Sequence, residues 1–302
     1  MHDICDPCRL GDATVDSEGS HICAGLFAET GACAMTRSLI SPQTAADLWQ
    51  AAHHLADVAR PVALSSFRKH GLTADNKDAS GFDPVTIADR ATEAVIRDAL
   101  AQMRPHDGIL GEEGDTVAGT SGLTWVIDPI DGTRGYLAGT PTWGVLIGLA
   151  DDAGPVLGIV DQPFIGERFC GGLGEAHVTG PQGKVDLATR PARPLSAAIV
   201  FTTFPEVGTR AEQAAFQRVS QAAQLTRYGM DCYAYALLAA GQIDLVIEAG
   251  LHSYDIMAPI AVVEAAGGMV TNWQGGPAHQ GGQAIAAANP AIHAEALALL
   301  NA

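Results

Sequence analysis

The sequence has few features that would direct the chain to a membrane or to nucleic acid. It contains no run of about eighteen apolar residues, so no transmembrane helix is expected. Its N-terminus lacks the basic and then apolar pattern of a secretory signal. Lysine and arginine total only 17 against 34 acidic residues, and this net charge of −17 argues against nucleic acid or an anionic membrane as partner. We therefore expect a cytoplasmic protein.

Cysteine is scarce in most of the chain, because four of the six cysteines lie within residues 1–34. Cys5 and Cys8 have the spacing of half a zinc site, but a second pair of ligands with matching spacing is missing. The same segment is rich in Gly, Ser, Ala and Asp and shows no periodicity. We expect residues 1–34 to be a disordered extension, with zinc binding as the alternative.

Two motifs of covalent ester chemistry are also missing, the G-x-S-x-G elbow and the Cys-x5-Arg loop. A serine or cysteine nucleophile is therefore disfavoured. The sequence therefore gives no indication of a covalent enzyme intermediate.

The rest of the chain changes character near residue 186. Residues 35–186 begin with helical periodicity and continue with short apolar runs separated by turns. Residues 187–302 alternate strand-like and helix-like segments. With 47% hydrophobic residues to build a core, we expect an α+β half followed by an α/β half.

Two helices are predicted before the first long strands. One begins after Ser41, with Pro42 in its first turn, and Pro61 is expected to bend or end it. The other runs from about Thr86 to Met103. Its apolar stripe consists of Ile87, Ala91, Val95, Ala99 and Met103.

The stretch TWVIDPIDGTRGYLAG, residues 124–139, places two aspartates three residues apart directly after a strand. Asp128 and Asp131 would repel each other unless a cation, a hydrogen-bond network or solvent offsets their charges. Gly132 permits a sharp turn, and the amides of a short helix start at Gly132 and Thr133 can bind phosphate oxygens. A cation site beside a phosphate site accounts for both features.

Four further acidic residues lie at the ends or starts of other predicted elements. Glu112 and Glu113 follow a short strand. Asp255 opens a late helix, and Asp89 lies early in the second helix. Taken singly, the glutamates could be a solvated pair, Asp255 a helix cap and Asp89 a charge favoured by the helix dipole. Together, carboxylates from several distant elements predict a multi-metal site, and hard oxygen ligands favour magnesium.

The blocks GEEG, WVIDPIDGT and YDIMAPIAVVEAAGG, in this order, resemble signatures of the inositol-monophosphatase family of magnesium-dependent phosphatases. The likeness covers residues 41–302 and implies a layered α-β-α-β-α sandwich with the site between its two halves. Within the family, stretches such as RYGMDCYAYALLAAGQIDLVIEAGLHSYD are most similar to the histidinol-phosphate phosphatase branch. The resemblance implies hydrolysis of a small phosphate monoester by metal-activated water, with histidinol phosphate of histidine biosynthesis as the first choice.

The resemblance also implies a site for two or three Mg²⁺ ions. Glu112, Asp128 and the backbone carbonyl of Ile130 would hold one ion. Asp131 and Asp255 would hold a second ion, which Asp128 shares.

The same resemblance implies the catalytic residues. Thr133 with Asp89 would orient and deprotonate the attacking water. Glu113 and Asp89 would lie in the surrounding shell, where a third, weaker ion would bind. The amides of Gly132 and Thr133, beside Asp131, would bind the phosphate.

Family substrate contacts map onto four residues of the second half, Arg227, Gly229, Asp231 and Glu248. Carboxylates at two of these positions would favour histidinol phosphate, which carries an ammonium group and an imidazole, over inositol, which has neither. Asp231 could instead cap the helix that follows it.

Two alternatives to a histidinol-phosphatase are considered. One is an inositol monophosphatase or a broad-range sugar or nucleotide phosphatase. The other is a catalytically idle homologue with a binding or regulatory role, which the intact acidic set argues against. The resemblance implies a homodimer in either case.

Overall fold

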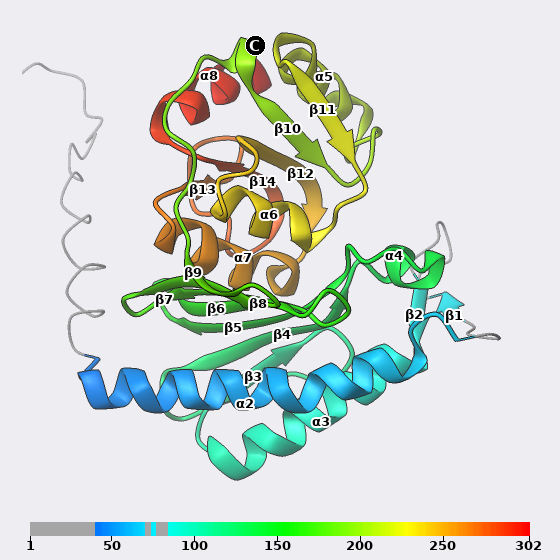
Figure 1. The fold of residues 1–302 in the computed structure, drawn as a ribbon, viewed down its shortest axis with the longest axis vertical. Coiled ribbons are helices and arrows are strands. Elements are labelled where there is room, and N and C mark those ends of the chain that lie inside the picture. Colours follow the sequence, from blue (N-terminus) through cyan, green and yellow to red (C-terminus); the bar gives the residue numbers. More distant parts are fainter. Residues whose placement is uncertain (1–39, 70–73, 77–83) are drawn as a thin grey trace, which may run out of the picture. The chain divides into compact units, whose positions relative to one another are not determined.

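The computed structural model describes residues 40–69, 74–76 and 84–302 (Figure 1). The predicted extension at residues 1–34 lies outside the described residues. Helix α2 (Pro42–Ser66) begins as predicted, and the N–H of Thr44 donates to the Ser41 hydroxyl at 3.1 Å. The helix does not end at Pro61. Alanines on both sides of this proline, at 59 and 63, are fully buried, so core packing outweighs the lost backbone hydrogen bond.

Helix α3 (Ile87–Met103) confirms the second predicted helix, but the predicted apolar stripe is not its buried face. Ile87 is 71% exposed and Met103 is 38% exposed. The buried face includes the acidic side chains of Asp89 and Glu93 instead. Polar contacts described below offset the cost of burying these two carboxylates.

The larger sheet has seven strands in the order β3-β4-β5-β6-β7-β8-β9. They are β3 (Gly108–Gly111), β4 (Thr124–Asp131), β5 (Gly144–Asp151), β6 (Gly154–Gln162), β7 (Glu167–Gly172), β8 (Glu175–Gly180) and β9 (Gly183–Asp186). The first pair is parallel and every later pair is antiparallel. A separate two-stranded sheet pairs β1 (Ala74–Asn76) with β2 (Pro84–Thr86).

The second sheet has five strands in the order β11-β10-β12-β14-β13. They are β10 (Ile199–Thr202), β11 (Leu225–Tyr228), β12 (Leu245–Leu251), β13 (Met269–Thr271) and β14 (Gly282–Ala287). Strands β11, β10 and β12 are parallel, whereas β14 is antiparallel to both neighbours. The remaining helices are α4 (Thr133–Ala138), α5 (Arg210–Ala222), α6 (Cys232–Ala239), α7 (Ser253–Ala265) and α8 (Pro290–Leu300), with a short 3-10 helix at Leu195–Ala197.

These elements form five layers, which confirms the predicted α-β-α-β-α sandwich (Figure 1). Helices α2 and α3 cover one face of the larger sheet, α6 and α7 lie between the sheets, and α5 and α8 cover the outer face of the smaller one. Three large apolar clusters fill the interfaces between these layers. Strand β9 ends the larger sheet at Asp186, where the two halves of the chain were predicted to meet; the division into domains stays a prediction.

None of the helices in the described ranges combines the length and apolar character that a bilayer crossing requires.

Candidate active site

Asp128 and Asp131 lie at the C-terminal end of β4, within the strand rather than after it. On a regular strand, residues three apart point to opposite faces of the sheet. Here Asp128 pairs with Leu146 and Asp131 with Gly144, so the register with β5 shifts by one residue between the two acids. This bulge turns both carboxylates to one side, where each has an oxygen within 4.8 Å of the other.

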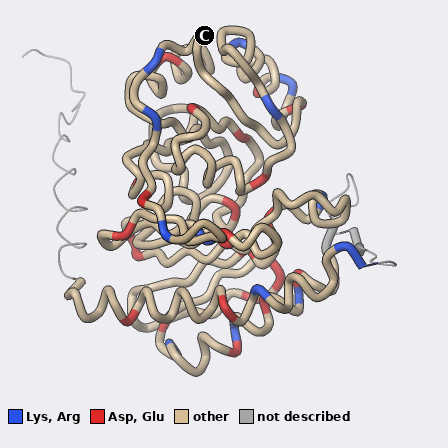
Figure 2. Tube along the Cα trace, viewed as in Figure 1, with Lys and Arg blue, Asp and Glu red and all other residues tan. Residues whose placement is uncertain are grey.

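The acidic residues predicted from the sequence form two clusters. The inner cluster combines Asp128 and Asp131 of β4 with Asp255 in the first turn of α7. The outer cluster combines Asp89, in the first turn of α3, with Glu112 and Glu113. Within each cluster, three carboxylate oxygens lie within 4.8 Å of one another. Figure 2 shows acidic positions, in red, both between the two sheets and on the helices that cover the other face of the larger sheet.

Backbone and hydroxyl donors fix the orientation of these carboxylates. Asp89 Oδ2 accepts from the backbone N–H of Thr86 at 2.8 Å and from its hydroxyl at 2.5 Å, so Asp89 starts α3 as well as facing the site. Asp255 Oδ2 accepts the N–H of His252 at 2.6 Å. Asp255 is therefore not the N-cap, which is His252, but the third helical residue of a capping box, and this role does not prevent it from joining the inner cluster.

The pKa values of the inner acids reflect their crowding. Burial raises the pKa of Asp128 well above its ordinary value, and repulsion from Glu112, Asp131 and Asp255 raises it further. Burial also raises the pKa of Asp131, with added repulsion from Asp231 and Asp255. Acids that repel one another in this way, and offer only oxygen donors, fit a hard divalent cation. The donor set of the site therefore suits magnesium.

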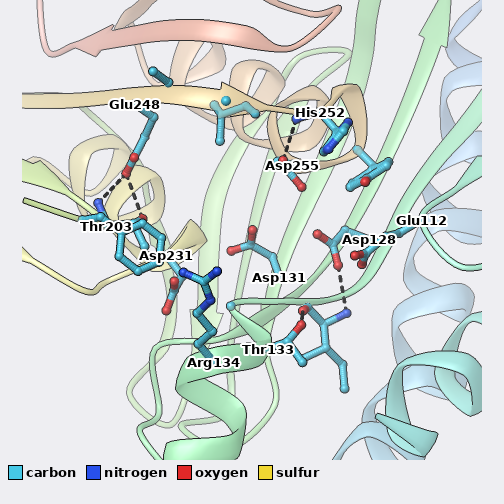
Figure 3. A pocket seen from close by; sticks show the side chains of 17 residues that line it. Glu112, Asp128, Asp131, Thr133, Arg134, Thr203, Asp231, Glu248, His252 and Asp255 are labelled. Atoms are coloured by element: carbon cyan, nitrogen blue, oxygen red, sulfur yellow. Dashed lines mark hydrogen bonds between the residues drawn. The ribbon is translucent and has the colours of Figure 1, made fainter. Parts of the chain in front are cut away.

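A cleft of about 470 Å³ joins these acids to a second polar region (Figure 3). Glu112, Asp128 and Asp255 surround one end of it. Asp231 and Glu248 lie at the other end. The cleft is also lined by Ile130, Asp131, Gly132, Thr133, Arg134, Thr203, Phe204, Ala249, Gly250, Leu251, His252 and Tyr254.

Thr133, the first residue of α4, lines the cleft and lies below Asp131 in the view of Figure 3. Its hydroxyl is 3.3 Å from Asp89 Oδ1 and 3.2 Å from the carbonyl oxygen of Ile130. Gly132 before it has φ of 88°, a conformation that glycine adopts without strain. A Cβ at Gly132 would come within 2.7 Å of the Asp231 carboxyl carbon, so this close approach also requires glycine.

Asp231 has an unusual backbone conformation for a residue other than glycine, with φ 46° and ψ −142°. Such conformations cost about 1–3 kcal/mol and are concentrated at functional sites. Although Asp231 precedes α6, its side chain makes no capping hydrogen bond within the described part of the chain. It accepts from the Thr142 hydroxyl at 3.2 Å. The capping explanation for Asp231 is therefore wrong.

Glu248, on β12, is buried and held by three donors. Its oxygens accept from the Thr203 N–H at 2.7 Å, the Thr203 hydroxyl at 2.9 Å and the Thr202 hydroxyl at 3.2 Å. Burial raises the pKa of Glu248 to about 7, although these donors favour its ionised form. Glu248 is thus a fixed carboxylate at the end of the cleft away from the inner cluster.

Two predicted substrate contacts are not brought into this cleft. Arg227, at the edge strand β11, and Gly229 after it are both exposed and are not among the described residues that line it. The strand predicted at these residues is present, but β11 lies at the edge of the smaller sheet, where β10 separates it from β12. The structure does not bring these two residues together with the acids.

Sequence analysis missed several residues of the cleft. Thr203 and Phe204 follow the carboxyl end of β10, where ligands commonly bind in sheets with parallel strands. That rule could have indicated them. His252 and Tyr254 flank the start of α7, and their rings stack with centroids 5.0 Å apart. No spacing in the sequence indicates this stacked pair.

The family model for the inositol monophosphatase family matches residues 45–302. The chain belongs to the inositol monophosphatase family. The prediction of a phosphoric monoester hydrolase is confirmed at the level of this family, which acts on small phosphate monoesters and depends on metal ions.

The chain is similar to phosphatases that are named for different substrates. The bifunctional phosphatase IMPL2 of Arabidopsis thaliana is 41% identical over 223 residues, which cover 73% of this chain and 63% of that relative, less than two thirds of its length. The histidinol-phosphatase of Mycobacterium tuberculosis is 33% identical over 251 residues, 82% of this chain and 95% of the relative. The solved structure of an inositol monophosphatase from Zymomonas mobilis is 38% identical, covers 84% of this chain and 97% of its own, and has a TM-score of 0.73.

Proposed function

We propose that this inositol monophosphatase family member hydrolyses histidinol phosphate to histidinol and phosphate. The observation that carries the proposal is the difference between the two ends of the cleft. One end has the clustered acids that suit divalent cations, and the other has two fixed carboxylates, Asp231 and Glu248. A substrate with a phosphate at one end and positive charge at the other matches this arrangement.

The proposed cofactor is Mg²⁺, with two or three ions bound. Glu112, Asp128 and the carbonyl of Ile130 would hold one ion, and Asp131 and Asp255 would share a second with Asp128. When bound, the ions would neutralise the phosphate and stabilise the charge that develops during displacement.

The proposed reaction uses Thr133 and Asp89 to activate water. The Asp89 carboxylate is held by Thr86 through one oxygen and faces the Thr133 hydroxyl through the other. Burial raises the pKa of Asp89, which makes its carboxylate a better proton acceptor than a solvated one. Water would attack phosphorus while its proton passes through the Thr133 hydroxyl to Asp89; the bond from phosphorus to the alcohol oxygen breaks, and that oxygen takes a proton from a solvent water, whose hydroxide is neutralised by the proton that Asp89 later releases.

The phosphate would lie at the start of α4, where the amides of Gly132 and Thr133 and the side chain of Asp131 line the cleft. The organic part would then extend towards Asp231 and Glu248. A primary ammonium or an imidazolium can donate to both carboxylates. Burial raises the pKa values of Asp231 and, to about 7, of Glu248, and a cation bound beside them would favour their ionised forms; the neutral hydroxyl groups of inositol would gain less from these two acids.

The proposal is tested by comparing two substrates at saturating Mg²⁺. We expect kcat/KM for histidinol phosphate to exceed that for inositol 1-phosphate by at least about tenfold, which corresponds to about 1.4 kcal/mol of discrimination. Phosphate release under identical conditions measures both rates. Equal values, or a preference for inositol 1-phosphate, would support the alternative of an inositol monophosphatase, which the 38% identity to the Zymomonas mobilis enzyme favours.

The role of Asp231 can be separated from its structural effects by Asp231→Asn. Asparagine keeps the size of the side chain and tolerates positive φ, so this change chiefly removes the charge. We expect KM for histidinol phosphate to rise about tenfold, with little change for a neutral ester such as inositol 1-phosphate. A parallel Asp151→Asn variant, outside the cleft lining at the end of β5, should change neither KM. An unchanged KM in Asp231→Asn would remove this residue from substrate binding.

A homodimer and a cytoplasmic location stay predictions of the sequence.

A further inference from the structure

We infer that Glu93 and Arg97 of α3 form a clamp that positions the loop at residues 111–115 for metal binding. The inference rests on the proposed metal site, because this loop carries Glu112 and Glu113. Neither clamp residue lines the cleft among the described residues, so each is a positioning residue rather than a catalytic one.

The clamp is defined by hydrogen bonds to the loop backbone. The Glu93 carboxylate accepts the N–H of Glu113 at 2.8 Å through one oxygen and the N–H of Gly114 at 2.9 Å through the other. Arg97 Nε donates to the same carboxylate at 2.6 Å. Arg97 also donates from Nη1 to the carbonyl of Asp115 at 2.9 Å. The two side chains therefore hold three consecutive residues of the loop.

Packing shows how closely the loop lies on the clamp. A Cβ at Gly111 would collide with the Glu93 carboxylate, and a Cβ at Gly114 would come within 2.9 Å of the Arg97 guanidinium. The two glycines of the GEEG block thus allow the backbone to rest directly on these side chains. The block is as much a contact surface for α3 as it is a source of ligands.

The position of Glu93 on the helix links the clamp to the site. Asp89, Glu93 and Arg97 follow one another at intervals of four residues, so they lie along one face of α3. Asp89 joins the outer cluster, and Glu93 accepts the backbone N–H of Glu113, a second acid of that cluster, next to Glu112. Glu93 is only 2% exposed, and its three donors offset the cost of burying its charge.

A neutral glutamine cannot replace this carboxylate. Only one of its two terminal atoms accepts hydrogen bonds, so its amide group would face one of the loop N–H donors. The loop would shift, and the carboxylates of Glu112 and Glu113 would shift with it. Changes to residues that orient metal ligands typically weaken metal binding about 10–100-fold.

The test is a titration of the metal-free protein with Mn²⁺, in which the electron paramagnetic resonance signal of free Mn²⁺ measures binding without substrate. We expect Glu93→Gln to raise the dissociation constant of at least one site about tenfold or more. Asp244→Asn is the matched control. Asp244 is also fully buried, accepts a backbone N–H from Ile199 at 2.9 Å and pairs with Arg190 at 3.0 Å, but it lies outside the cleft. It should lower the melting temperature and leave Mn²⁺ binding unchanged.

The outcomes separate the inference from the proposed function. If the wild-type protein binds no Mn²⁺, the proposed metal site is wrong. If the wild type binds Mn²⁺ and Glu93→Gln binds it equally well, only the clamp is wrong; an equal loss of binding in Asp244→Asn would also overturn the clamp. Should Glu93→Gln fail to fold, Arg97→Met keeps the carboxylate and removes its partner. It should weaken Mn²⁺ binding in the same direction, and unchanged binding in this variant would overturn the inference.

Discussion

Asp128→Asn is expected to lower kcat/KM by at least about 10³-fold at saturating Mg²⁺ while the fold is retained. Asp128 would be a ligand of both proposed ions, so the loss of its charge would weaken each site and remove about 4 kcal/mol of transition-state stabilisation. Phosphate release measures the rate, and circular dichroism checks the fold. A variant with a near-normal rate would contradict the role of Asp128 in both ion sites.

Although Asp128→Asn should lower the activity, it should not lower the stability of the metal-free protein and is expected to raise it. Because the pKa of Asp128 is raised by burial and neighbouring acids, its ionised form destabilises the fold above an ordinary aspartate pKa of about 4. Asparagine removes that charge. The metal-free variant should therefore melt at the same or a higher temperature than the wild type at pH 7, and the difference should vanish as pH falls below about 4.

Asp89→Asn is expected to lower kcat about 10²–10³-fold, because the Thr133–Asp89 pair would lose its proton acceptor. The variant also loses the negative charge in the first turn of α3, so the loss of the proton acceptor must be distinguished from a weaker helix start. Glu212→Gln is the matched control, since Glu212 has the same position in the capping box of α5 and does not line the cleft.

Glu212→Gln should lose about 1 kcal/mol or less of stability, because hydrogen bonds from Thr209 and Gln283 lower the pKa of Glu212; Asp89→Asn should lose no more than that, because burial raises the pKa of Asp89. Only Asp89→Asn should lose activity. If Glu212→Gln loses kcat to the same extent, or if Asp89→Asn retains it, the assignment of Asp89 as the proton acceptor is wrong.

The sequence was sufficient to predict the layered fold and the residues that gather in the two acidic clusters. Helix starts such as Ser41 and Thr86 carry their signal locally, and strands such as β7 and β8 carry it in turn residues on both sides. Strand β9 carries no such signal, because all four of its residues are exposed and only Val185 is apolar.

The buried face of α3 could be predicted only in part from hydrophobicity, because it combines Ile96 and Leu100 with two acidic residues. The stripe from Ile87 to Met103 consists of apolar residues and was therefore predicted to face the core, but the structure exposes both of these residues and buries Asp89 and Glu93. These carboxylates are buried because donors reach Asp89 from the N-cap residue Thr86 and reach Glu93 from the loop after β3. These donors are backbone groups or lie far away in the sequence, so the hydrophobic periodicity of α3 gives no sign of them.

The substrate end of the cleft was only half predicted for a related reason. Asp231 and Glu248 enter it, whereas Arg227 does not. Which strand ends meet depends on the order of strands in the smaller sheet, where β12 is central and β11 is at the edge. Sequence order does not specify that arrangement.

The capping bonds of Asp89 and Asp255 bear on how a pseudoenzyme of this architecture would evolve. Each of these aspartates starts a helix through a bond to a backbone N–H, from Thr86 or His252, and would be retained for that purpose after turnover had ceased. Asp128 lies in the most crowded part of the site, and without cations its charge works against folding. Selection for stability alone would replace it first, so the residue at position 128 is the best marker of whether a relative still turns over substrate.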